Sequence, residues 1–323
     1  MYITHKKKYP AYSPMFWKAY FIQMRPYLLF VSGIAGAAGI AMSENADHAG
    51  WKSYLSFILF FLGYGFGQAL TDCFQTDTDK LSAPYRPLSK EIISIPSVLT
   101  VSIAGLLSSG VLFYLLHPVT FWLCLIAVFG LATYSFIKKN YWFGGPFYNA
   151  WIVALLPVMG YFACMNDSVT KFPSQLYPCI GISFFSYANF VLIGYLKDIE
   201  ADKTTNYKTF PVVFGWNKTL ILGDFFAIFT IILYWWLPLK NMRELIFGLA
   251  GTVIIIAGQV TGHLTHDQNE KGALIPILST VRGFILLHSA LVLHFEPNWW
   301  IAIAIYYLLF EWALNNRPSK YQV

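Results

Sequence analysis

Ten long apolar segments dominate this chain and determine where it can fold. A helix needs about 20 apolar residues to cross the hydrocarbon core of a bilayer, and only helices or closed barrels can span that core. Because the segments show no strand-like alternation, we expect an all-α, polytopic bundle of membrane helices. The predicted spans are residues 26–43, 53–71, 94–116, 119–137, 146–165, 177–196, 219–238, 244–263, 273–294 and 298–314.

The composition agrees with an integral, multi-pass membrane protein. The chain is 57% hydrophobic, 19% aromatic and only 12% charged, with a mean hydropathy of +0.52. Residues 1–20 are basic and aromatic but contain no compact apolar run, so we predict no cleavable signal peptide. The four cysteines lack paired or metal-binding spacing, and we expect them to be free thiols.

The distribution of Lys and Arg predicts the orientation. With the N-terminus in the cytoplasm, the cytoplasmic segments carry 17 of the 22 Lys and Arg residues, whereas the opposite loops carry 4 and a span holds Arg282. Cytoplasmic loops accumulate positive charge, so the net charge of +6 does not indicate nucleic-acid binding. We expect a basic cytoplasmic segment (1–25), a transmembrane domain (26–294), and an additional C-terminal span with a tail (295–323).

An acidic cluster follows the second predicted span, at its cytoplasmic end. On a continuous helix, Asp72, Gln75 and Asp79 lie on one face, whereas Asp77 points elsewhere. Carboxylates beside long apolar runs are unfavourable and mark functional sites. A polar helix end bathed by water is the alternative explanation.

A second acidic cluster follows the sixth predicted span, on the same side of the membrane. Asp198 and Asp202 share a helix face at spacing i, i+4, and this pairing is repulsive unless a cation bridges it. Carboxylate oxygens are preferred ligands of Mg²⁺, which commonly binds together with substrate phosphates. Two matched clusters therefore favour a Mg²⁺ site over two solvated helix ends.

Basic side chains accompany the acidic clusters in the predicted cytoplasmic loops. Together with carboxylate-bound metal, Lys and Arg donors can hold a diphosphate and stabilise it as it leaves. For each lysine alone, the positive-inside bias is the simpler explanation. The candidate donors are Arg86, Lys138, Lys139, Lys203 and Lys208.

At these motifs the chain resembles the UbiA superfamily of intramembrane prenyltransferases. Residues 72–79 (DCFQTDTD) and 84–87 (PYRP) resemble the first family motif and the loop after it. Residues 198–202 (DIEAD) and 208–212 (KTFPV) resemble the second motif. Arg25 precedes a proline, as at the start of the first family helix. The resemblance extends from about residue 20 to residue 294.

The resemblance implies a nine-helix fold around a central cavity that is capped on the cytoplasmic side. Two or more Mg²⁺ ions would bridge the acidic motifs to a prenyl diphosphate of the farnesyl or geranylgeranyl class. The diphosphate would leave, an acceptor would attack the allylic cation, and the tail would lie in an apolar tunnel open to lipid. The implied metal ligands are Asp72, Gln75, Asp79, Asp198 and Asp202, and the four aspartates are the implied catalytic residues.

Three further positions complete the predicted site. Arg25 is predicted to orient the diphosphate or an anionic acceptor. Tyr64 and Tyr187 precede the acidic clusters on their helices, so their rings could stabilise a carbocation by about 0.5–2 kcal/mol. Ordinary packing is the alternative role for both rings.

Two features depart from the family pattern. Gln75 stands where the family has Asp, and its neutral carbonyl oxygen can ligate Mg²⁺ without supplying charge. The segment 298–314 would be a tenth span. Within a predicted span, Arg282 indicates either a functional group facing a wet cavity or an ion pair between helices.

Prenyl transfer to an unknown lipophilic acceptor is the leading functional hypothesis. A terpene cyclase on the same scaffold is the first alternative. It needs no acceptor, and the altered first motif and rich aromatic content are compatible with it. A transporter is the remote alternative, because it would place carboxylates near the bilayer midplane rather than at one surface.

Overall fold

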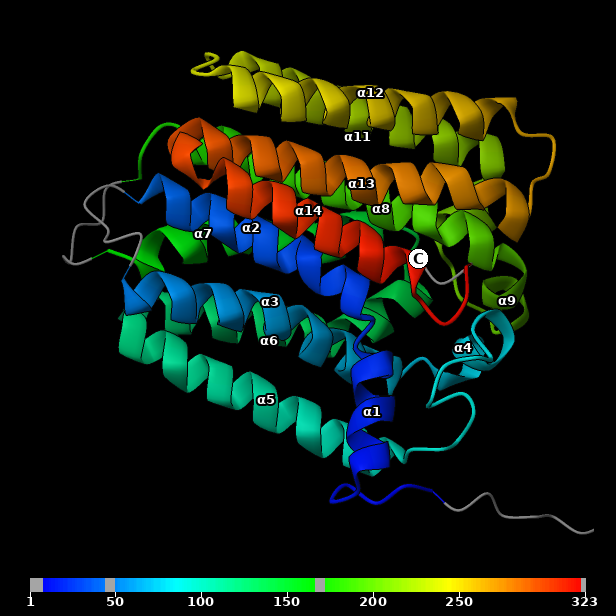
Figure 1. Cartoon of the computed structure of the whole chain (residues 1–323). Coiled ribbons are helices and arrows are strands. Elements are labelled where there is room, and N and C mark those ends of the chain that lie inside the picture. The colour runs from blue at the N-terminus through cyan, green and yellow to red at the C-terminus, as the bar shows by residue number, and fades with distance from the viewer. Residues whose placement is uncertain (1–7, 44–49, 166–171, 321–323) are drawn as a thin grey trace, which may run out of the picture.

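The computed structural model is a helical bundle (Figure 1) and describes residues 8–43, 50–165 and 172–320. Residues 1–7 of the predicted N-terminal segment and 321–323 of the predicted tail lie outside the described residues. All ten predicted segments form helices. The elements are α1 (Pro14–Gln23), η1 (Pro26–Leu28), α2 (Leu29–Met42), α3 (Trp51–Asp72), α4 (Thr76–Ser82), α5 (Ile95–Leu116), α6 (Pro118–Asn140), α7 (Pro146–Ala163), α8 (Leu176–Gly194), η2 (Tyr195–Asp198), α9 (Ile199–Thr204), α10 (Phe210–Phe214), α11 (Trp216–Trp236), α12 (Met242–Leu264), α13 (Glu270–Phe295), η3 (Pro297–Trp299) and α14 (Trp300–Asn315).

The number of membrane-spanning helices is close to the number predicted. Within the described residues, eight helices are long and apolar enough to cross a membrane, or nine if α1 and α2, bent by 53°, form one broken span. The predicted tenth span corresponds to α14, which has 16 residues. At 1.5 Å per residue α14 is about 24 Å long, shorter than the hydrocarbon core of about 30 Å. A tenth crossing therefore stays a prediction.

The long helices form an inner group and an outer group. Helix α2 contacts α7, α8 and α13, and α8 contacts α7 and α13; these four helices supply most of the largest buried cluster. Within the membrane-spanning windows, 78% of the α13 residues and 72% of the α8 residues are buried, against 33% for α5, α6 and α12. The outer helices expose apolar side chains, which a bilayer would cover.

Small residues allow the inner helices α2 and α7 to pack closely. A Cβ atom at Gly39 would lie 1.9 Å from the carbonyl oxygen of Pro157, and one at Gly160 would lie 2.2 Å from the carbonyl oxygen of Gly36. Small residues at such interfaces let helix backbones approach in membranes. This contact fixes α2 at the centre of the bundle.

Short helices gather at one end of the bundle and form a cap. Helix α4 follows α3, α9 follows α8, and the two short helices contact each other (Figure 1). Helix α1 crosses the long helices near the same end and buries Phe16 and Tyr20 beside α3. Only a basic segment was predicted here from the sequence, although Ser13 caps α1 and Pro14 starts it.

The C-terminal helix α14 is attached to the bundle through polar contacts. Arg282 on α13 donates two hydrogen bonds to Glu311 on α14, at 2.7 and 2.8 Å. Tyr307 also donates to Glu311 at 2.9 Å, and Tyr306 donates to the carbonyl oxygen of Phe30 on α2 at 2.7 Å. Arg282 therefore forms the interhelical ion pair that was one of its two predicted roles.

Candidate active site

Asp72, the last residue of α3, lies at the centre of a buried hydrogen-bond network and is only 2% exposed. Its carboxylate accepts hydrogen bonds from Gln23 Nε2 at 2.6 Å, Gln68 Nε2 at 2.7 Å and Arg25 Nη2 at 2.8 Å. Arg25 lies at the break between α1 and η1 with φ of 56°. This left-handed conformation is uncommon for a non-glycine residue, and such positions concentrate at functional sites.

Arg86, from the loop after α4, connects the two aspartates of the first motif. Its Nη1 atom lies 2.6 Å from Asp79 Oδ2 and 3.8 Å from Asp72 Oδ2. Burial raises the pKa of Asp79 above its usual value, although Arg86 opposes this effect. Burial alone would lower the pKa of Arg86, but Asp79 and Asp72 hold that pKa above its usual value. Arg86 therefore remains charged.

Gln75 lies in the turn between α3 and α4 and positions a buried lysine. Lys138 Nζ donates to Gln75 Oε1 at 3.0 Å, and Gln75 Nε2 donates to Ser135 at 3.1 Å. The ammonium lies 4.8 Å from the ring centre of Tyr195 and 5.3 Å from that of Tyr207. A cation over aromatic faces is stabilised without being neutralised, so Lys138 stays available to an anion.

The two aspartates of the second motif lie in different environments. Asp198, at the end of η2, pairs with Lys197 at 3.1 Å and lines the same cavity as Asp72 and Asp79. Asp202, on α9, is fully buried and accepts hydrogen bonds from Thr78 at 3.2 Å and Thr209 at 3.1 Å. Asp202 therefore joins α9 to α4.

A second set of contacts joins α4 to α6 and to the loop after α9. Asp77 accepts hydrogen bonds from Lys139 Nζ at 2.7 Å and from the hydroxyl of Tyr207 at 3.1 Å. Partial burial opposes ionisation, but the bonds from Lys139, the Thr78 amide and Tyr207 hold the pKa of Asp77 below its usual value. We call the contacts of Asp77 and Asp202 the cap latch.

A polar cavity of about 640 Å³ lies beneath the cap. Four cationic and three carboxylate side chains line it, so it carries an excess of positive charge and is suited to an anionic ligand. The charged residues are Arg25, Arg86, Lys138, Lys197, Asp72, Asp79 and Asp198.

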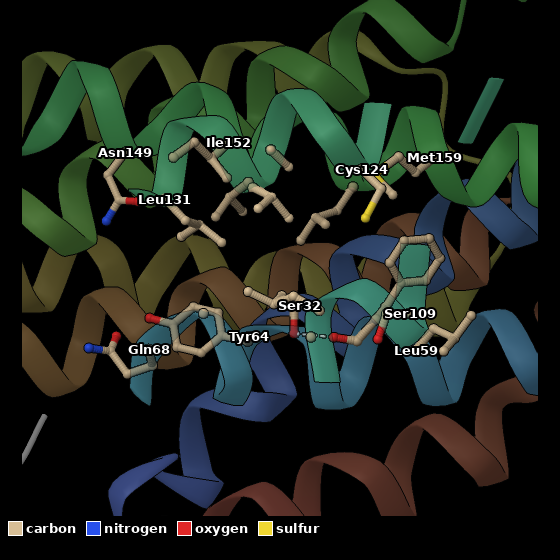
Figure 2. Close-up of a pocket in the computed structure, with 18 of the residues that line it drawn as sticks. Ser32, Leu59, Tyr64, Gln68, Ser109, Cys124, Leu131, Asn149, Ile152 and Met159 are labelled. Carbon is tan, nitrogen blue, oxygen red and sulfur yellow. Dashed lines mark hydrogen bonds between the residues drawn. The ribbon is translucent and has the colours of Figure 1, made fainter. Parts of the chain in front are cut away.

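An apolar cavity of about 820 Å³ continues from the polar one between α3, α5, α6 and α7. Figure 2 shows Tyr64, Gln68 and Asn149 at one end of this cavity, and Leu59, Cys124 and Met159 at the other. Five residues line both cavities, and we call them the neck. They are Tyr64, Gln68, Tyr134, Asn149 and Tyr187.

Comparison with known proteins assigns this fold and cavity to a family. The model of the UbiA prenyltransferase family matches residues 30–275. The chain belongs to this family. Membership makes the chain an enzyme of the prenyltransferase class, as the sequence predicted. It supports prenyl transfer in general rather than terpene cyclisation.

Two archaeal relatives carry the same name. The digeranylgeranylglyceryl phosphate synthase of Thermococcus kodakarensis is 26% identical over 226 residues, which cover 70% of this chain and 79% of the relative. The synthase of that name from Sulfurisphaera tokodaii is 27% identical over 215 residues, which cover 67% of this chain and 76% of the relative.

Solved structures of UbiA proteins share the fold. A digeranylgeranylglyceryl phosphate synthase structure superposes with a TM-score of 0.63 at 20% identity, covering 87% of this chain and 99% of that one. A UbiA homologue from Archaeoglobus fulgidus bound to DMAPP and Mg²⁺ superposes with a TM-score of 0.60 at 19% identity, covering 83% and 98%. The predicted all-α UbiA fold is thereby confirmed, with eight or nine candidate membrane spans in the described residues.

Most of the site residues predicted from the sequence lie around the two cavities of this UbiA protein. Those that line a cavity are Arg25, Tyr64, Asp72, Gln75, Asp79, Arg86, Lys138, Tyr187 and Asp198. Among the residues that the structure describes, Lys139, Asp202, Lys203 and Lys208 do not line either cavity. Lys139 belongs to the cap latch, and the side chains of Lys203 and Lys208 are exposed.

Several residues that line the cavities or hold the site were not among the predicted site residues. Gln68 lies one helical turn before Asp72, and Lys197 is adjacent to Asp198, so their positions beside the motifs could have indicated them. Gln23 carried no such signal because it depends on α1, which was not predicted. Tyr134 and Asn149 occupy the neck but lie on helices without an acidic motif.

The chemistry of the UbiA cavity is suited to Mg²⁺ bound together with a phosphate ligand. In the described residues, no three His, Cys, Asp or Glu side chains form a ready-made metal site. Mg²⁺ is usually held by one or two carboxylates plus substrate phosphates rather than by an all-protein cage. Asp72, Asp79 and Asp198 supply hard oxygen ligands around one cavity and meet that requirement.

Proposed function

We propose that this enzyme transfers a prenyl group of the farnesyl or geranylgeranyl class from its diphosphate to a lipophilic acceptor, with two or more Mg²⁺ ions. The joined cavities carry this proposal. One cavity is polar and positively charged, the other is apolar, and both meet at the neck. A prenyl diphosphate has the same division between a charged head and a hydrocarbon tail.

The polar cavity would bind the diphosphate. Arg25, Arg86, Lys138 and Lys197 converge on this cavity and can donate hydrogen bonds to phosphate oxygens. Bound Mg²⁺, held by Asp72, Asp79 and Asp198, would stabilise the negative charge that develops on the leaving diphosphate. Gln75 orients Lys138 rather than adding a negative charge at this position.

The neck would hold the reacting carbon. When the bond between C1 and the diphosphate oxygen breaks, both electrons leave with the oxygen and an allylic cation remains. The rings of Tyr64, Tyr134 and Tyr187 lie at this level and can stabilise the cation through their π faces. An acceptor oxygen or carbon then supplies the electron pair for the new bond and loses a proton.

The acceptor and the sidedness are also part of the proposal. The archaeal relatives are named digeranylgeranylglyceryl phosphate synthases, so a monoprenylated glyceryl phosphate is the first acceptor to test, beside a phenolic one. The Lys and Arg distribution supports a cytoplasmic location for the cap, the polar cavity and the N-terminus.

Purified enzyme with Mg²⁺ provides the test. We expect diphosphate release that depends on an acceptor, and we expect Asp79→Asn and Asp198→Asn to reduce kcat at least about 100-fold, as loss of a charge-stabilising group does. Asp224→Asn is the control, because Asp224 pairs with His263 and Gln259 outside both cavities. A cyclic hydrocarbon formed without acceptor, or full activity of Asp198→Asn, would contradict the proposal.

A further inference from the structure

Helix α1 presents a large apolar face to its surroundings. One side of the helix packs against the bundle, but Met15, Trp17 and Phe21 are each more than half exposed. Lys18 is the only charged residue of α1, and it is also exposed. Three large apolar side chains exposed on a ten-residue helix are unfavourable in water, so lipid or another protein surface must cover this face.

The depth of α1 in the bundle indicates that the cover is lipid. The chain approaches α1 beside the loop that precedes α5, where the Tyr9 amide donates to the carbonyl oxygen of Ile92 at 2.9 Å. The hydroxyl of Tyr20 lies 2.8 Å from Ser102 Oγ. Ser102 is seven positions from the start of α5 at Ile95 (102 minus 95), or about 10 Å along the helix axis. This is the depth at which interfacial helices lie in a bilayer.

Helix α1 is too short, and too strongly bent away from α2, to cross the membrane by itself. Its ten residues extend about 15 Å, half of a hydrocarbon core of about 30 Å. The chain bends by 53° between α1 and α2, and α1 crosses the long helices near the cap (Figure 1). On α5, the exposed Ile103 and Leu107 lie deeper in the span than the Tyr20 contact. Lipid that covers them is adjacent to α1.

Exposed lysines beside α1 favour anionic headgroups. Lys18 on α1, Lys8 before it and Lys90 in the loop before α5 are all exposed. The neighbouring carboxylate of Glu91 is paired with Lys80 at 2.7 Å, so this surface keeps a net positive charge. Aromatic side chains are enriched at membrane interfaces, and lysines near the surface attract anionic lipids.

The end of α1 connects this face to the polar cavity. Gln23, the last residue of α1, donates to Asp72 at 2.6 Å and accepts a hydrogen bond from the Leu88 amide at 3.2 Å. Arg25, two residues further on, donates to Asp72 at 2.8 Å. Movement of α1 would therefore remove two donors from Asp72 and release the loop that carries Arg86.

We propose that α1 is an interfacial helix whose exposed face binds anionic headgroups and upper acyl chains of the leaflet at the cap end, and that this binding holds Gln23 and Arg25 on Asp72. Anionic lipid then tightens the binding of a prenyl diphosphate in the polar cavity. This last consequence rests on the proposed function. The location of α1 and its coupling to the loop after α4 do not.

Fluorescence quenching in lipid nanodiscs tests the location of α1. All four native cysteines are buried, so Trp17→Cys can be labelled with a bimane fluorophore. Leu107→Cys, at an exposed position 12 residues into α5 (107 minus 95), is the reference for a deep site. We expect lipids with a nitroxide close to the headgroup to quench position 17 most strongly, and lipids with a nitroxide near the chain end to quench position 107. Quenching of position 17 mainly by aqueous iodide, or by no lipid, would overturn the proposal.

Hydrogen exchange tests the coupling without any substrate. Because Gln23 holds the Leu88 amide, we expect peptides from residues 84–92 to exchange at least about threefold more slowly in phosphatidylglycerol nanodiscs than in phosphatidylcholine nanodiscs. The double variant Lys8→Gln with Lys18→Gln should remove most of this difference. Lys218→Gln, which changes an exposed lysine at the start of α11, is the matched control and should retain it.

Gln23→Ala separates the location of α1 from its coupling. We expect this variant to keep the quenching profile of position 17 but to lose the effect of lipid on exchange of residues 84–92. Equal exchange of wild-type protein in the two lipids, or a lipid effect that persists unchanged in Gln23→Ala, would overturn the coupling.

Binding of geranylgeranyl diphosphate with Mg²⁺ tests the consequence for the site. We expect the Kd of wild-type protein to be at least about threefold lower in phosphatidylglycerol than in phosphatidylcholine nanodiscs, and this ratio to be lost in the Lys8 and Lys18 double variant. Equal Kd values for wild-type protein would overturn the effect on binding. If wild-type protein binds no prenyl diphosphate in either lipid, the proposed function fails, whereas quenching and exchange still decide the role of α1.

Discussion

Asp77 lies at the outer edge of the cap and binds three partners at once. Its carboxylate accepts hydrogen bonds from Lys139, from the hydroxyl of Tyr207 and from the Thr78 amide. These donors favour the ionised form, and the pKa of Asp77 is lowered although partial burial opposes this. Because the pKa of Asp77 is lower in the folded state than in the unfolded state, its ionised carboxylate stabilises the fold at pH values above the usual aspartate pKa. This stabilisation is lost as the pH falls through the lowered pKa.

We therefore expect Asp77→Asn to loosen α4 at neutral pH but not in acid. Hydrogen exchange of the α4 peptide, compared between wild type and variant at the same pH, measures this. The difference should be largest near pH 7 and disappear below the lowered pKa of Asp77, where wild type is also protonated. A difference that persists unchanged in acid would show that the carboxylate charge does not hold the latch.

The two aspartates of the second motif show what spacing can and cannot predict. The i, i+4 rule places Asp198 and Asp202 on one face, and it holds for a continuous α-helix. Here η2, a 3₁₀ segment, ends at Asp198 and α9 begins at Ile199. Asp198 is therefore the N-cap of α9, with φ of −102° and ψ of 4° instead of α-helical angles, so the two carboxylates do not lie on one continuous helix face. Asp198 lines the cavity and Asp202 enters the cap latch.

At the scale of elements, α14 is held by an ion pair within an otherwise apolar interface. Arg282 and Glu311 are 30% and 22% exposed and form a two-point contact, to which Tyr307 adds a hydrogen bond. Both charges are partly buried between α13 and α14. Removing one partner leaves the other without its counter-charge in that environment.

We expect Glu311→Gln to lower the free energy of unfolding by about 1–3 kcal/mol, because the pair is partly buried and Arg282 then lacks its counter-charge. The double variant Arg282→Met with Glu311→Leu should recover most of that loss, because apolar residues of similar size replace both charges. Thermal unfolding in detergent provides the comparison. If the double variant is as unstable as the single one, the pair has a role beyond attaching α14.

The long apolar helices were predictable from the sequence, because a bilayer restricts such segments to helical structure. Every predicted span formed a helix, because about 20 apolar residues in lipid have no other means of satisfying backbone hydrogen bonds. Helix α1 is only ten residues long and depends on packing of Phe16 and Tyr20 against α3. That tertiary contact has no local pattern, so α1 and its neighbour Gln23 were missed.

For the whole molecule, the cap and the opposite end of the bundle should face different compartments. Lys80, on α4 in the cap, and Lys240, between α11 and α12, are both exposed. All four native cysteines are buried. Single cysteines at these two positions are therefore suitable reporters of sidedness.

We expect a membrane-impermeant maleimide to label Lys80→Cys only from the cytoplasmic side and Lys240→Cys only from the other side. Intact cells and inverted vesicles provide the two directions, and the wild-type chain is the control for background labelling. Labelling of both positions from the same side would contradict the predicted topology and the placement of the polar cavity.

The neck joins a polar, positively charged cavity to an apolar cavity, and this arrangement has a consequence for inhibitor design. A hydrolysis-resistant bisphosphonate joined to a hydrocarbon tail would occupy both compartments together. Once the bisphosphonate head binds in the polar cavity, the tail is held close to the apolar cavity. The two weak affinities therefore combine into a much stronger one. Changing the tail alone would then tune selectivity among related membrane enzymes without altering the charged head.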